Sequence, residues 1–139
     1  MNMYLRRYFV PLSCCAAACL LTACATSRES LRASASRLDD ASSHFSSQIR
    51  YQGDDSRRGR VSRDAEELAQ AAHNFEHALA RGDSRDNVTA GYHRVTDDYK
   101  QLNGQLADEG YAQQNRQVLA DFDRVTAAYR DVEAGMSRQ

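Results

Sequence analysis

Cysteine and proline are scarce in this chain and are confined to its beginning. The 139 residues include one proline, Pro11, and four cysteines, the last of which is Cys24. The sequence after Cys24 therefore cannot form an internal disulfide, and in an oxidising compartment its stability must come from core packing. No proline interrupts a helix in this part of the chain. Its length suits one compact domain and is too short for two.

A strong excess of charge of either sign is also missing. The chain has 18 basic and 19 acidic residues and a net charge of −1. Two of the arginines, Arg6 and Arg7, lie in the first 23 residues, which contain no acidic residue, so the remainder carries a net charge of −3. This balance suggests neither a nucleic-acid partner nor a polybasic face that binds lipid.

Only one long hydrophobic run is present, and it lies close to the N-terminus. The 14 residues from Tyr8 to Leu21 are largely apolar, follow Arg6 and Arg7, and end in small residues. A membrane-spanning helix needs about 20 apolar residues, so this run is too short to remain in a membrane. A basic flank, a short apolar segment and a small-residue end are typical of a secretory signal peptide, which we expect at residues 1–23.

The end of this segment, Leu21-Thr22-Ala23-Cys24, resembles the lipobox of bacterial lipoproteins. The resemblance implies that Cys24 receives diacylglycerol on its sulfur, that cleavage occurs between Ala23 and Cys24, and that the new amino group is acylated. Several acyl chains make dissociation from a membrane negligible. Because Ala25 rather than aspartate follows Cys24, the resemblance further implies transport to the outer membrane, in its periplasm-facing leaflet.

Two other ways of processing this segment stay open. Ala23-Cys24-Ala25 also fits an ordinary small-residue cleavage site, which would release a soluble periplasmic protein. Cleavage before Cys19 would place Ala16 where a lipobox has a branched residue, which makes it the weaker alternative.

Four segments repeat one hydrophobic pattern, with successive members four, three, four, three and four residues apart. A mean spacing near 3.6 residues places each set along one stripe of a helix. Four such stripes with short connections predict an all-α, antiparallel up-down four-helix bundle. The four sets are Leu31, Ala35, Leu38, Ser42, Phe45 and Ile49; Val61, Ala65, Leu68, Ala72, Phe75 and Leu79; Val88, Tyr92, Val95, Tyr99, Leu102 and Leu106; and Val118, Phe122, Val125, Tyr129, Val132 and Met136.

Capping residues predict where these helices begin and end. We expect helices at about 27–50, 62–81, 84–108 and 113–135, with 24–30 as a short lipidated tether and 31–136 as the bundle. Thr26 with Glu29 reads as a capping box, and Ser62 and Ser84 suit N-caps. Gly82 and Gly110 suit helix C-termini.

Residue size along the stripes predicts how the two halves of the bundle pack. Small residues such as Ala35 and Ala72 recur in the first two helices, whereas large ones such as Tyr99 and Phe122 recur in the last two. Since large side chains opposite small ones fill a core without voids, we expect these rings to pack on the small faces. Ser42 is the expected hydrogen-bond partner of a buried tyrosine hydroxyl.

His73 and His77 are the residues that most resemble a metal site. With Glu76 they match the H-x-x-E-H pattern of a metallopeptidase class. Ala72 and Phe75 define the buried stripe, however, so both histidines are expected to face solvent, where they allow at most weak metal binding. The stripes contain no Asp, Glu or His, and we therefore expect no cofactor in the core.

The membrane-distal end is the expected site of function. In an up-down bundle, a short tether at Cys24 places the loops at 51–61 and 107–114 farthest from the lipid. These loops contain side chains typical of protein interfaces, namely Arg57, Arg58, Arg60, Arg63 and Tyr111. We expect a non-enzymatic, lipid-anchored interaction or accessory module that contacts another envelope protein. The alternatives are an immunity protein against a toxin delivered to the periplasm and a protein that binds a small ligand or metal.

Overall fold

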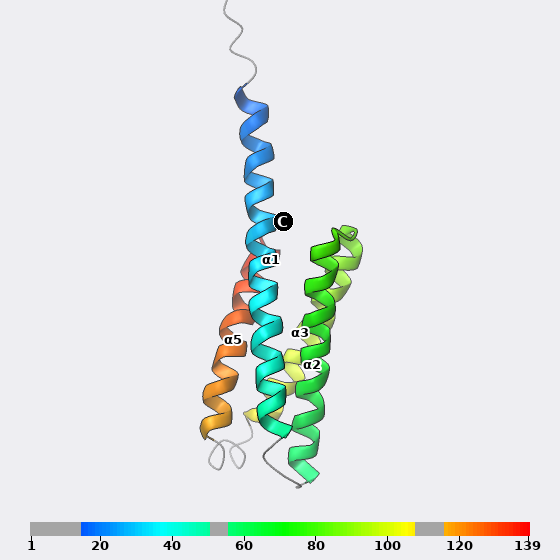
Figure 1. The fold of residues 1–139 in the computed structure, drawn as a ribbon, viewed down its shortest axis with the longest axis vertical. Coiled ribbons are helices and arrows are strands. Elements are labelled where there is room, and N and C mark those ends of the chain that lie inside the picture. Colours follow the sequence, from blue (N-terminus) through cyan, green and yellow to red (C-terminus); the bar gives the residue numbers. More distant parts are fainter. Residues whose placement is uncertain (1–14, 51–55, 108–115) are drawn as a thin grey trace, which may run out of the picture.

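The computed structural model describes the backbone of residues 15–50, 56–107 and 116–139, and most side chains from Ser27 onward. The helices in these ranges are α1 (Cys15–Arg50), α2 (Ser56–Arg81), α3 (Arg85–Leu106) and α5 (Arg116–Met136). They run alternately up and down and form an antiparallel bundle (Figure 1). The predicted all-α four-helix fold is confirmed.

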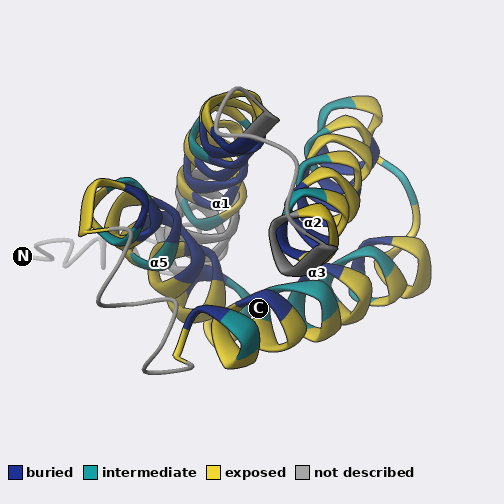
Figure 2. Ribbon diagram, turned by 90° about the horizontal axis from the view of Figure 1, so that it is seen from below, coloured by how far each residue is buried: buried dark blue, intermediate teal, exposed yellow. Residues whose placement is uncertain are grey.

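The four stripes form the core. Each helix turns its buried face inward and its exposed face outward (Figure 2). All but three of the stripe residues are buried, and the exceptions are the partly exposed Tyr92, Tyr99 and Met136. The buried face is wider than the stripe, because residues that flank it, such as Ser34, Asp64 and Ala71, are buried too. A core-facing helix of a globular bundle uses such flanking positions in addition to a and d.

The turn between α2 and α3 forms as expected. Gly82 has a φ of 73°, and the amides of Gly82 and Asp83 donate to the carbonyls of Leu79 and Ala78, over 3.2 and 3.0 Å. These two bonds are a Schellman motif, which satisfies carbonyls at the end of α2. Ser84 then accepts a hydrogen bond from the Asn87 amide and caps the start of α3.

The predicted starts of the first two helices are wrong. α1 continues through Thr26, and α2 through Ser62, so neither residue is an N-cap. The alanine-rich segment before Thr26 favours helix, and so do the arginines before Ser62, which outweigh the single Gly59. The tether at 24–30 is consequently helical. Gly110 lies outside the described residues, and α3 ends at Leu106 with Ala107 as its C-cap.

The helices are not equally spaced around the bundle. α1 packs closely against α2 and α5, and α2 packs closely against α3, whereas the α3 and α5 backbones stay farther apart. Aromatic rings fill this wider interface. Tyr99 of α3 stacks on Tyr129 and Phe122 of α5, with ring centroids 4.1 and 5.7 Å apart.

The structure pairs these rings with other rings, and their expected contact with the small faces stays a prediction. Two rings of the second hairpin contact rings of the first, Phe122 against Phe45 and Tyr92 against Phe75, with ring centroids 5.3 and 6.4 Å apart. Ser42 is not the partner of a tyrosine. Tyr99 and Tyr129 instead form hydrogen bonds across the interface to Thr126 and Thr96, over 3.2 and 3.3 Å.

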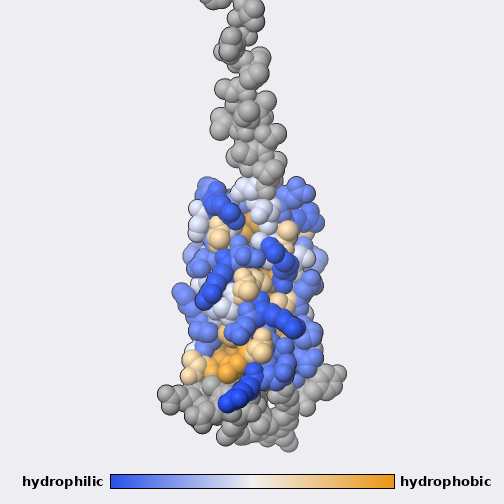
Figure 3. Space-filling view, turned by 90° about the vertical axis from the view of Figure 1, so that its left-hand side faces the viewer, coloured by the Kyte–Doolittle hydropathy of each residue, from blue (hydrophilic) through white to orange (hydrophobic). Residues whose placement is uncertain are grey.

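The outer surface is mostly polar. On the side of the molecule where α5 lies, hydrophilic side chains cover most of the face, with apolar patches between them (Figure 3). Within the described part of the chain, no helix has the apolar length that crossing a membrane requires.

Candidate functional site

Cys24 lies within α1, although its side chain is outside the described part of the chain. α1 continues without a break from Cys24 to Leu31, the first buried core residue. At about 1.5 Å per residue, these seven positions span about 10 Å. A lipid on Cys24 would therefore join the bundle through a helix rather than through a loose tether.

A polar groove lies between the outer faces of α1 and α2. Its volume is about 580 Å³, and α1 contributes serine hydroxyls to it, whereas α2 contributes carboxylate, amide and basic side chains. The groove brings together Arg63 and His73, two residues that the sequence singled out for different reasons. Its lining consists of Ser43, Ser46, Ser47, Arg63, Glu66, Glu67, Ala69, Gln70 and His73.

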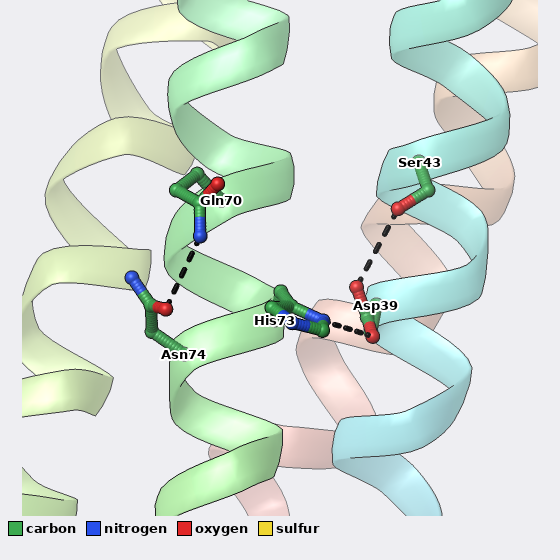
Figure 4. Close-up of polar contacts among 5 residues, drawn as sticks. All are labelled: Asp39, Ser43, Gln70, His73 and Asn74. Atoms are coloured by element: carbon green, nitrogen blue, oxygen red, sulfur yellow. Dashed lines mark hydrogen bonds and ion pairs between the residues drawn. The ribbon is translucent and has the colours of Figure 1, made fainter.

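The polar contacts beside this groove centre on Asp39 (Figure 4). One Asp39 carboxylate oxygen lies 3.2 Å from Nδ1 of His73, and the other accepts a bond of 3.5 Å from the Ser43 hydroxyl. In a catalytic triad the histidine must contact the hydroxyl in order to remove its proton. Here the carboxylate lies between hydroxyl and imidazole, so this trio cannot generate a serine nucleophile by that route.

His73 and His77 face solvent, as predicted from their positions on the helix. Their ring centroids are 4.4 Å apart, one turn along α2. Across the residues whose side chains the structure describes, no group of three or more His, Cys, Asp or Glu side chains is arranged to hold a metal ion. What the structure presents is a pair of exposed imidazoles, one of which contacts Asp39.

The proposed arginine surface is only partly described. Arg60 and Arg63 are exposed on the first turns of α2, and Arg63 lines the groove. Arg57 and Arg58 lie in α2 rather than in a loop, because this helix begins at Ser56, and their side chains are outside the described part. Tyr111 also lies outside the described residues, so its position relative to these arginines is untested.

A buried polar contact between α2 and α3 was not predicted. The carboxylate of Asp64, buried in α2, accepts a hydrogen bond from the Gln105 amide of α3. Nearby on α3, partial burial and then the Glu67 carboxylate raise the pKa of Asp98 above its usual value. Asp64 stands three positions after Val61 of the stripe, so a search of the flanking positions would have found it.

Comparison of the chain with protein-family models, with curated proteins and with solved structures yields no match.

Proposed function

We propose that this chain is a lipid-anchored, non-enzymatic protein-interaction module of the bacterial cell envelope. In this proposal Cys24 carries the lipid after removal of residues 1–23, and the bundle stands on the periplasmic side of the outer membrane. Its partner is another envelope protein.

The observation that carries this proposal is the unbroken course of α1 from Cys24 into the core. A lipid at Cys24 would then set the orientation of the whole bundle. The turn at Gly82 would lie at the membrane end, and the first turns of α2, with Arg60 and Arg63, would lie at the other end (Figure 1). The exposed end would thus be available to a protein partner.

The groove between α1 and α2 supports binding rather than catalysis. It is lined mainly by polar side chains of both charges, and arginine is enriched in protein interfaces because its planar group combines contact area with hydrogen bonding. The order of the Ser43, Asp39 and His73 contacts does not suit a hydrolase. We therefore assign the groove and the exposed Arg60 as the partner surface.

Intact-mass analysis of the protein from membranes tests the anchor. The expected mass is that of residues 24–139 with acyl chains on Cys24. A polypeptide that begins at Thr26, without Cys24 or acyl chains, would support the soluble periplasmic alternative and would contradict the anchored form.

A photo-crosslinking residue at Gln70, in the groove, tests the partner surface in cells. The matched control is the same residue at Gln101, which is exposed on α3 and outside the groove. We expect a discrete protein adduct from position 70, absent from position 101 and reduced by a double Arg60→Ser and Arg63→Ser change. Equal adducts from both positions, or none from either, would remove the assignment, and a toxin as the crosslinked protein would identify the immunity role.

A further inference from the structure

Three arginines from distant parts of the sequence meet in a cavity at the end of the bundle where α1 enters it. Arg28 belongs to α1, Arg85 is the first residue of α3, and Arg138 follows the end of α5. The cavity has a volume of about 660 Å³. The entry of α1, the α2–α3 turn and the C-terminus lie at this same end in Figure 1.

The cavity combines an apolar base with a basic rim. Leu79 and Val88, which also belong to the core, contribute apolar surface, Ser27 contributes a small side chain, and Gly82 contributes only backbone. α3 begins beside the cavity, and the start of a helix carries partial positive charge from its free amide groups. The apolar base and the basic rim together fit a molecule with an anionic group and an adjoining apolar part.

The three arginines of this cavity outnumber the acidic side chains in its lining. Asp83 is the one acidic side chain in its lining, and it already pairs with Arg81 over 3.1 Å. Among the described residues, no carboxylate pairs with Arg28, Arg85 or Arg138. Guanidinium groups bind phosphate through paired, charge-assisted hydrogen bonds, so three of them around one space favour a phosphate ligand.

The position of the cavity indicates where that phosphate comes from. Cys24 lies three residues before Ser27 in the same helix, which corresponds to about 4.5 Å along its axis. A lipid on Cys24 would place the cavity at the level of the phospholipid headgroups. We propose that this cavity binds the phosphate of an anionic phospholipid headgroup next to the anchor. This inference rests on the proposed anchoring, whereas binding of phosphate itself does not.

Titration of the full chain in a neutral maltoside detergent tests the proposal. The probes are soluble dihexanoyl phosphatidylglycerol, dihexanoyl phosphatidylcholine and inorganic phosphate, and the amide signals of Gly82 to Val88 report on the site. We expect phosphatidylglycerol to bind more tightly than the other two probes and to shift these signals. Each arginine near a lipid surface contributes roughly fivefold, so a triple Arg28→Gln, Arg85→Gln and Arg138→Gln change is expected to weaken binding on the order of 100-fold.

The matched control removes the same charge from exposed arginines outside the cavity, Arg94, Arg124 and Arg130. Affinity in this control should change less than threefold. Equal weakening in both triple variants would show general charge attraction and would overturn the site. Inorganic phosphate that binds as tightly as phosphatidylglycerol would overturn the lipid assignment. Whether Cys24 carries a lipid is tested separately by the intact-mass measurement.

Discussion

Several buried side chains of this bundle are polar, and they differ in whether they have a hydrogen-bond partner. Ser34 and Asp64 both have partners in the core, since Ser34 donates to the Ser30 carbonyl over 3.1 Å and Asp64 accepts from Gln105. Ser42 differs, because its hydroxyl oxygen is buried and has no hydrogen-bond partner among the described residues. A buried hydroxyl without a partner loses its hydrogen bonds to water and gains none, which destabilises the folded state.

Ser42→Ala should therefore stabilise the bundle. The expected gain in the free energy of unfolding is about 1 kcal/mol, measured by urea denaturation of the full chain. Ser34→Ala is the control, since it makes the same change in helix propensity but removes a hydrogen bond that exists. If Ser34→Ala stabilises the protein as much as Ser42→Ala, helix propensity alone accounts for the gain.

Asp98 makes stability depend on pH. Burial and the Glu67 carboxylate raise the pKa of Asp98 in the folded state, so between its unfolded and folded pKa the folded protein holds more protons. Stability should consequently decrease as pH rises through that window, which begins near the ordinary aspartate pKa of about 3.9, and stay lower above it.

Asp98→Asn is expected to remove the decrease in stability at higher pH. The variant should be more stable than the parent at neutral pH, and the difference should shrink toward zero below about pH 3. Unfolding free energies measured from pH 3 to 7 check this, with Asp123→Asn, at an exposed position of α5, as the control. A constant difference between Asp98→Asn and the parent at all pH values would contradict the prediction.

Pairs of helices approach closely where one of them has a glycine. An added Cβ at Gly135 of α5 would lie 2.8 Å from Cδ1 and 3.6 Å from Cα of Leu31 in α1. At Gly91 of α3 the corresponding Cβ would lie 3.4 Å from a ring carbon of Phe75 in α2. The α1–α5 contact is thus the tighter of the two, and it lies near the membrane end of the proposed orientation.

Gly135→Ala should destabilise the protein although alanine favours helix. Leu31 is fully buried, so its Cδ1 methyl has no free space to turn into, and relief of the contact requires a strained rotamer or a shift of the helices, at a cost of about 1–2 kcal/mol. Gly104→Ala is the matched change, because its added Cβ would have no atom within 4 Å and should raise stability by up to about 1 kcal/mol. Thermal and urea unfolding measure both, and the same sign for the two variants would refute the packing argument.

At the scale of the molecule, the described helices form a ring of four, with three close interfaces and one wide interface. The wide one, between α3 and α5, is joined by stacked rings and by hydroxyl bonds such as Tyr99 to Thr126. The two ends of the bundle also differ in their chemistry. The end that faces the membrane in the proposed orientation holds the cavity with Arg28, Arg85 and Arg138, while the opposite end begins α2 with Arg60 and Arg63 exposed.

Helix periodicity, read from the sequence alone, determined the core and the buried face of each helix. The stripes predict nearly every buried large residue, because a helix repeats its faces every 3.6 positions whatever it packs against. The turn at Gly82 and Ser84 was also predictable, since positive φ and N-capping depend on local chemistry. The starts of α1 and α2 were not, because helix-favouring segments extended both beyond the expected caps.

Only the tertiary structure decided which side chains meet. Tyr99 of α3 stacks on Tyr129 of α5, because the spacing of helices depends on all four at once. The cavity of Arg28, Arg85 and Arg138 could not be foreseen for the same reason, and a net negative charge even argued against a basic site. Residues more than 50 positions apart come together only when the bundle closes. The sequence thus defined the faces of the helices, and the rotation and separation of those helices created the sites between them.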